Sequence, residues 1–81
     1  MNKVYVKVDY QILIGGMIRP IRIRWNDGRT WEIKKVLHSC SSTYDYEGIR
    51  YTILIGSAER YLYRVDDKWY VEAIQTEVDT G

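Results

Sequence analysis

The sequence predicts a small all-β protein, in which six antiparallel strands form a meander that closes as a barrel of the SH3-like type. Three observations support this fold class. Apolar and polar residues alternate along most of the chain, as is typical of half-buried strands. Turn signals separate the alternating segments at intervals of about ten residues. No segment long enough for an ordinary helix places its apolar residues at helical spacing.

Length and composition fit a single domain. A chain of 81 residues buries about 60% of its unfolded surface, so its stability margin is thin. With 46% hydrophobic residues the chain can build a core without disulfides or metal, and one cysteine, Cys40, cannot form an internal disulfide. We therefore expect a barrel over residues 1–74 and a frayed acidic tail over 75–81. Without an apolar signal segment or a run of about 18 apolar residues, we expect a cytoplasmic protein that does not enter a membrane.

The first two strands are predicted from alternation and from one glycine pair. The first strand covers residues 3–14, and Gly15-Gly16 then predicts a two-residue hairpin turn. The second strand covers residues 17–25. Pro20 lies inside it and cannot donate a ladder hydrogen bond, which favours an edge position or a bulge. The apolar phase also shifts near Pro20, as one extra residue in the strand would cause.

A second hairpin gives the strongest local signal in the chain. Asp27-Gly28 lies between two alternating segments, and glycine adopts a positive φ there at no steric cost. The third strand follows over residues 30–40. Its apolar phase slips at Lys34-Lys35, which predicts a bend of the kind that a small barrel needs at its corners.

The rest of the chain predicts one long loop and three strands. Residues 39–48 are small, polar and turn-forming, so we expect a loop there that can carry a binding function. The strands cover residues 49–55, 60–65 and 68–74 and are joined by short turns. Large apolar residues occupy both faces of 60–65, and the pattern leaves open which face is buried.

A strip of basic residues on the second and third strands is the first candidate binding site. Alternation places Arg22 and Arg24 on one face of the second strand and Lys34 on the same face of the third, with Arg19 near the end of the strip. The strip is either a solvated outer face with cross-strand ion pairs or a surface that binds phosphates. Phosphate binding by a nucleic-acid partner also needs exposed aromatic residues for base stacking, and the candidates are Tyr5, Tyr61, Tyr63 and Tyr70.

The net charge of +1 argues against a nucleic-acid partner, because such domains are usually strongly basic. The charge is nevertheless uneven. Residues 1–65 hold 11 Lys and Arg against 6 Asp and Glu, whereas residues 66–81 hold 1 against 5. The acidic end is either a solvated terminus or a competitor for anionic ligands of the basic part.

Two other groups of residues are weighed as sites. Tyr44 and Tyr46 in the predicted loop resemble a binding-loop composition, although an ordinary connection is the favoured explanation. His38 and Cys40 could share a strand face as two metal ligands, but a structural zinc site needs four and the chain has no other His or Cys. The pair also lacks a third group that would orient it for nucleophilic catalysis. We therefore expect no metal, no cofactor and no enzymatic activity.

Three segments carry a resemblance to known sequences. Residues 25–37 read Trp-Asn-Asp-Gly-Arg-Thr-Trp-Glu-Ile-Lys-Lys-Val-Leu, residues 50–53 read Arg-Tyr-Thr-Ile, and residues 69–72 read Trp-Tyr-Val-Glu. This combination resembles a group of small uncharacterised bacterial proteins, mostly from Firmicutes, with a Trp-x-Asp-Gly-Arg-x-aromatic-x-Ile-x-x-Val-Leu pattern. The resemblance implies a compact β-barrel and assigns no functional residue. The composition of residues 39–48 departs from the pattern.

These observations lead to two alternative functions. The first is a non-enzymatic accessory module that binds another protein or a second copy of itself, through an edge strand or a tyrosine-rich surface. The second is a barrel that binds nucleic acid with the basic strip and nearby tyrosines. The salt dependence of oligonucleotide binding discriminates between them, since each phosphate contact releases counterions.

Overall fold

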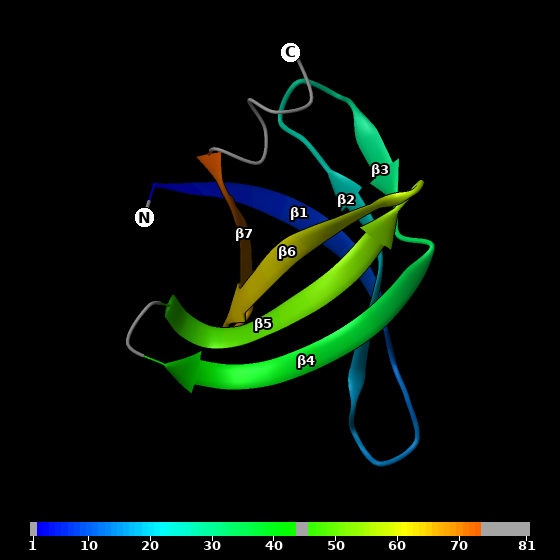
Figure 1. Cartoon of the computed structure of the whole chain (residues 1–81), viewed down its shortest axis with the longest axis vertical. Coiled ribbons are helices and arrows are strands. Elements are labelled where there is room, and N and C mark those ends of the chain that lie inside the picture. The colour runs from blue at the N-terminus through cyan, green and yellow to red at the C-terminus, as the bar shows by residue number, and fades with distance from the viewer. Residues whose placement is uncertain (1, 44–45, 74–81) are drawn as a thin grey trace.

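The computed structural model describes residues 2–43 and 46–73, which form one antiparallel sheet of seven strands (Figure 1). The strands are β1 (Lys3–Ile12), β2 (Ile18–Arg24), β3 (Thr30–Glu32), β4 (Lys35–Thr43), β5 (Tyr46–Ile55), β6 (Ala58–Val65) and β7 (Lys68–Glu72). Their order across the sheet is β3-β2-β1-β7-β6-β5-β4. The sheet curls into a half-barrel (Figure 1), so the predicted all-β antiparallel fold is confirmed. Among the described residues, none belongs to a helix long and apolar enough to cross a membrane.

The predicted third strand is divided into β3 and β4, which is why the described residues form seven strands rather than six. The division lies at Ile33 and Lys34. Ile33 donates its backbone N–H to the carbonyl of Ile21 in β2 at 2.9 Å, and Lys34 donates to Leu54 in β5 at 2.8 Å. The chain therefore crosses from one end of the sheet to the other at this corner. The phase slip in the sequence marks the corner correctly.

The predicted loop over residues 39–48 is wrong for most of its length. β4 continues to Thr43 and β5 begins at Tyr46, and these two residues are paired. Polar side chains are compatible with β4 because it is an outermost strand of the described sheet, where they can face water. The sequence signal failed because His38, Ser39 and Ser41 are exposed in this edge strand, so apolar alternation is not needed there.

The β1–β2 turn is one residue longer than predicted. Leu13 donates its N–H to the carbonyl of Met17 at 2.7 Å, and Gly16 donates to the carbonyl of Leu13 at 2.9 Å. The connection therefore comprises Ile14, Gly15 and Gly16 rather than the glycine pair alone. Both glycines have positive φ, at 90° and 86°, which explains why two of them are needed.

The bulge predicted near Pro20 is confirmed. Tyr10 pairs with Pro20 while the preceding Asp9 pairs with Arg22, so Ile21 is the extra residue. This extra residue brings Pro20 onto the inner face of the sheet, where its side chain is fully buried. Because of the bulge, Ile18 before the proline and Ile23 after it both face the core.

The main core lies inside the curl of the sheet. Trp31 and Ile33, which alternation places inward, are partly buried and pack against this core. Its most buried members are Ile23, Ile53, Leu62 and Val71, at 0%, 0%, 0% and 1% exposure, and its other buried members are Val6, Trp25, Tyr51 and Trp69.

A second, smaller cluster is formed by two tyrosines on the opposite face. The rings of Tyr63 and Tyr70 are stacked, with centroids 4.8 Å apart, and both side chains are buried. Leu62, next to Tyr63 in β6, belongs to the main core. The middle of β6 is therefore buried on both faces, which answers the question that the sequence left open.

Candidate functional site

Two members of the basic strip, Arg22 and Arg24, form ion pairs with nearby carboxylates. Arg22 contacts the carboxylates of Glu32 and Asp9, the latter at 3.0 Å, and Arg24 lies 2.9 Å from the same Asp9. Asp9 is in β1, Arg22 and Arg24 are in β2, and Glu32 is in β3, so the network joins three neighbouring strands. This arrangement favours the interpretation of Arg22 and Arg24 as an ion-paired outer face.

The same contacts shift the acidities of the two carboxyl groups. Hydrogen bonds from Arg24 and then Arg22 lower the pKa of Asp9. A hydrogen bond from Arg22 lowers the pKa of Glu32. Both carboxylates therefore remain charged to more acidic pH in the folded chain than in the unfolded chain.

Replacing Asp9 with asparagine is expected to make the stability of the fold less dependent on pH. Since the folded pKa is depressed, the ion pairs stabilise the fold above the ordinary carboxyl pKa and lose this effect as the pH falls through the folded value. The D9N variant should therefore unfold at lower urea concentration than the parent at neutral pH. The two midpoints should converge in strong acid, and a difference that is the same at both pH values would contradict the prediction.

Arg19 and Lys34, the other predicted members of the basic strip, lie elsewhere. Together with Lys35 they line a groove of about 280 Å³ between β2 and the start of β4. In the described part of the chain none of these three cations has an ion-pair partner. The remaining lining residues are apolar: Pro20, Ile21, Ile33 and Val36. The structure thus separates Arg19 and Lys34 from the neutralised pair Arg22 and Arg24.

The predicted tyrosines do not form one surface. Tyr61 is 40% exposed, and the guanidinium of Arg50 lies 4.5 Å from its ring centroid. Tyr63 is buried and donates its O–H to a carboxylate oxygen of Glu72 at 2.5 Å. Burial, followed by this hydrogen bond, raises the pKa of Tyr63, so its hydroxyl remains a donor. Tyr44 and the side chain of Tyr46 lie outside the described residues.

His38 and Cys40 lie on the same face of β4, since they pair with Thr52 and Arg50 in β5. The part of the chain that the structure describes contains no group of three or more His, Cys, Asp or Glu that could hold a metal ion. This pair therefore supplies two potential ligands at most.

The structure reveals an open strand edge that the sequence did not predict. β1 pairs with β7 from Lys3 to Val6 and with β2 from Lys7 to Ile12. Beyond Val6 the side of β1 that faces away from β2 has no strand partner among the described residues. The second half of β1 is therefore an edge strand.

Backbone parity identifies the groups on this open edge. Ala73 donates its N–H to the carbonyl of Asn2 at 3.0 Å, so even-numbered residues of β1 direct their backbone groups toward β7. Leu13 donates its N–H to Met17, so odd-numbered residues direct theirs toward β2. Beyond Val6, where the pairing with β7 stops near the first residue of β7, the residues whose N–H and C=O groups face the open side are Val8, Tyr10 and Ile12.

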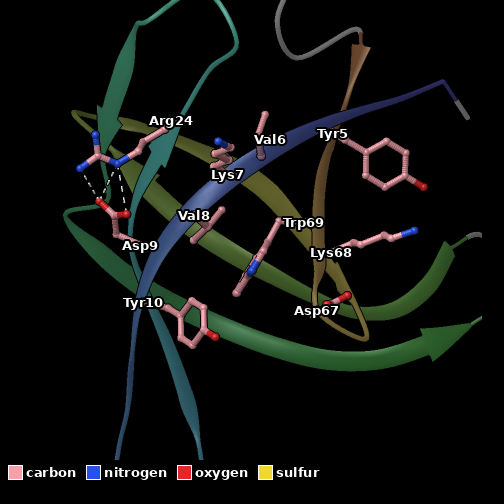
Figure 2. Close-up of a pocket in the computed structure, with 10 residues that line it drawn as sticks. All are labelled: Tyr5, Val6, Lys7, Val8, Asp9, Tyr10, Arg24, Asp67, Lys68 and Trp69. Carbon is pink, nitrogen blue, oxygen red and sulfur yellow. Dashed lines mark hydrogen bonds and ion pairs between the residues drawn. The ribbon is translucent and has the colours of Figure 1, made fainter.

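A groove of about 730 Å³ runs beside this edge (Figure 2). Its apolar wall is supplied by Val8 and Tyr10 from β1 and Trp69 from β7. The ring centroids of Tyr10 and Trp69 are 5.8 Å apart. Asp67 and Lys68, where the β6–β7 turn leads into β7, lie across the groove from Val8 and Tyr10 (Figure 2). The groove thus combines unpaired backbone groups with apolar side chains.

The β1–β2 hairpin projects beyond the half-barrel (Figure 1) and carries exposed apolar residues at its tip. Ile14 is fully exposed, and Ile12 and Met17 are 69% and 67% exposed. The segment from Tyr10 to Ile18 contains no charged residue. In a chain with 28% charged residues, an uncharged run of this length is unusual. It is the feature of the sequence that could have indicated the open edge of β1 and the hairpin tip.

No protein-family model, no curated protein and no solved structure matches this chain. The resemblance to small bacterial proteins therefore stays a prediction. The function has to be inferred from the geometry of the open edge and the two grooves.

Proposed function

We propose that this protein is a non-enzymatic binding module that accepts an extended strand of a protein partner at the open edge of β1. The observation that carries the proposal is the set of three consecutive edge positions whose backbone groups are unpaired in the described chain: Val8, Tyr10 and Ile12. In strand addition, main-chain hydrogen bonds supply affinity and pockets for alternate side chains supply specificity. The groove beside β1 offers such pockets.

The character of the edge supports a protein partner. Exposed edge strands are usually protected by charges, by proline or by a short length. Between Tyr10 and Ile12 the β1 edge has neither a charge nor a proline, and the nearest charge, Asp9, is already paired with arginines. An SH3-like half-barrel would then serve as the rigid scaffold from which the hairpin projects.

A displayed library of random peptides tests the proposal without knowledge of the natural partner. The chain should enrich peptides with alternating apolar residues. The I12K variant should bind them at least roughly tenfold more weakly, because a buried lysine opposes strand addition. Ile12 is 69% exposed, so this substitution should not affect folding.

The matched control is Q11K, which adds the same charge to the adjacent, outward-facing position of the hairpin. It should leave peptide binding nearly unchanged. Failure to enrich any peptide, or equal weakening by I12K and Q11K, would contradict strand addition at β1.

A second candidate function is the binding of a single-stranded nucleic acid along the groove between β2 and β4. It is supported by Arg19, Lys34 and Lys35, which have no ion-pair partner in the described chain and beside which no acidic residue lines the groove. If an oligonucleotide binds, the logarithm of its binding constant should fall linearly with the logarithm of the salt concentration. The double variant R19A/K34A should reduce this slope by about one for each phosphate contact removed. The variant R22A/R24A should reduce the slope less than R19A/K34A does. A larger reduction by R22A/R24A would count against binding in this groove.

A further inference from the structure

We infer that the strand received at the β1 edge is β1 of a second copy of this chain, paired antiparallel about a two-fold axis at Tyr10. This inference rests on the proposed function and specifies its partner. Exposed apolar residues gathered on one projecting element usually mark an interaction site, and an isolated two-stranded hairpin is marginally stable in water. The hairpin fits both descriptions, with Ile12, Ile14 and Met17 at its tip all more than half exposed.

The distribution of charge fits pairing between identical strands. A two-fold axis places each residue against a fixed counterpart, so like charges are the main obstacle. With the axis at Tyr10, Asp9 of one copy faces Gln11 of the other, and Lys7 faces Leu13. An axis at Asp9 would instead bring two aspartates together. The axis at Tyr10 opposes no like charges.

The same axis also uses all of the open backbone groups. It pairs Tyr10 with Tyr10 and Val8 with Ile12, and each of these residues directs its N–H and C=O to the open side. An axis at Gln11 would place Val8 opposite Ile14, which lies in the turn beyond β1. An axis at Asp9 would place Ile12 opposite Val6, which already pairs with Trp69 of β7. The axis at Tyr10 pairs the three open positions with one another.

The other side of the hairpin is unsuited to such pairing. Pro20 in β2 has no N–H to donate, and Arg19 beside it would approach a like charge in a symmetric contact. On the β1 side, Ile12 of the second copy would lie beside Val8 at the groove wall formed with Trp69. The symmetric contact therefore covers apolar surface at the hairpin and in the groove together.

Sedimentation over a range of concentrations tests the pairing. The unmodified chain should show a monomer–dimer equilibrium. The I12K variant should raise its dissociation constant at least roughly tenfold, since a lysine would be placed beside Val8 of the second copy. The Q11K variant, whose lysine would face Asp9, should leave association unchanged or slightly stronger.

Oxidative cross-linking tests the register. In a C40S background, Y10C should form disulfide-linked dimers, because residues opposite each other in a hydrogen-bonded antiparallel pair have Cα atoms about 5.5 Å apart, within the range of disulfides. Q11C in the same background should not, because the axis at Tyr10 offsets the two copies of this residue. Preferential cross-linking of Q11C would overturn the proposed register.

A chain that stays monomeric at all concentrations would overturn self-pairing. If displayed peptides still bind at the β1 edge, the proposed function stands and only this inference fails. If neither association nor peptide binding depends on Ile12, both fail. Binding of zwitterionic phosphatidylcholine vesicles by the monomer, abolished by I12K, would replace the second copy with a lipid surface and would also overturn the inference.

Discussion

Replacing Ile53 with alanine is expected to destabilise the fold by about 2–5 kcal/mol, the range for deleting a large aliphatic side chain from a core. Ile53 lies near the C-terminal end of β5, between Val36 of β4 and Arg60 of β6, and its side chain is fully buried in the main core. A domain of 81 residues has a total stability of roughly 4–12 kcal/mol, so the I53A variant should lose a large fraction of its free energy of unfolding. Urea denaturation followed by tryptophan fluorescence measures the loss.

The matched control for I53A is I12A, which makes the same substitution at a residue that is 69% exposed. Removal of an exposed side chain away from special features usually changes stability by less than about 0.5 kcal/mol. Equal losses for the two variants would mean that the core does not lie inside the curl of the sheet.

Replacing Gly48 with alanine is expected to cost at least about 2 kcal/mol, through backbone strain and a steric clash together. Gly48 lies in β5 with a φ of 81°, a conformation that residues with a Cβ rarely adopt. A Cβ at this position would overlap the carbonyl oxygen of Arg64 and lie 2.9 Å from its carbonyl carbon. Because these atoms belong to the backbone of β6, the two strands would have to separate locally.

Gly28 provides the control for G48A, since it has a similar φ of 93° but nothing within 4 Å of the position that a Cβ would occupy. The G28A variant should therefore lose only the conformational term, about 1–2 kcal/mol. Thermal unfolding of both variants measures the difference. A G48A protein as stable as G28A would show that β5 and β6 do not approach each other as closely as described.

Much of the sheet could be predicted because burial on one face imposes alternation. The Asp27-Gly28 turn is an example. Gly28 donates its N–H to the carbonyl of Trp25 at 3.1 Å, and its positive φ is the conformation that the turn requires. The corner at Lys34 was also visible, since a strand that bends must shift its apolar phase. Alternation failed at β4, where edge position removes the need for an apolar face.

The candidate site could be predicted only in part. Sequence identified Arg22 and Arg24 as a basic strip, but it could not show that Asp9, distant in the chain, neutralises both. Nor could it show the open edge, because Tyr10 and Ile12 alternate like any strand. Their exposure depends on where β7 begins relative to β1, and pairing between strands so far apart in the chain leaves no local signal.

Amide hydrogen exchange along the second half of β1 measures the open edge most directly. In dilute solution the amides of Val8, Tyr10 and Ile12 should exchange quickly, whereas the odd-numbered amides from Lys7 to Gln11, which face β2, should be protected. At high concentration the three fast amides should become protected as a second copy pairs with β1. Equal protection of odd and even amides in dilute solution would show that another strand already covers this edge and would contradict the proposed binding site.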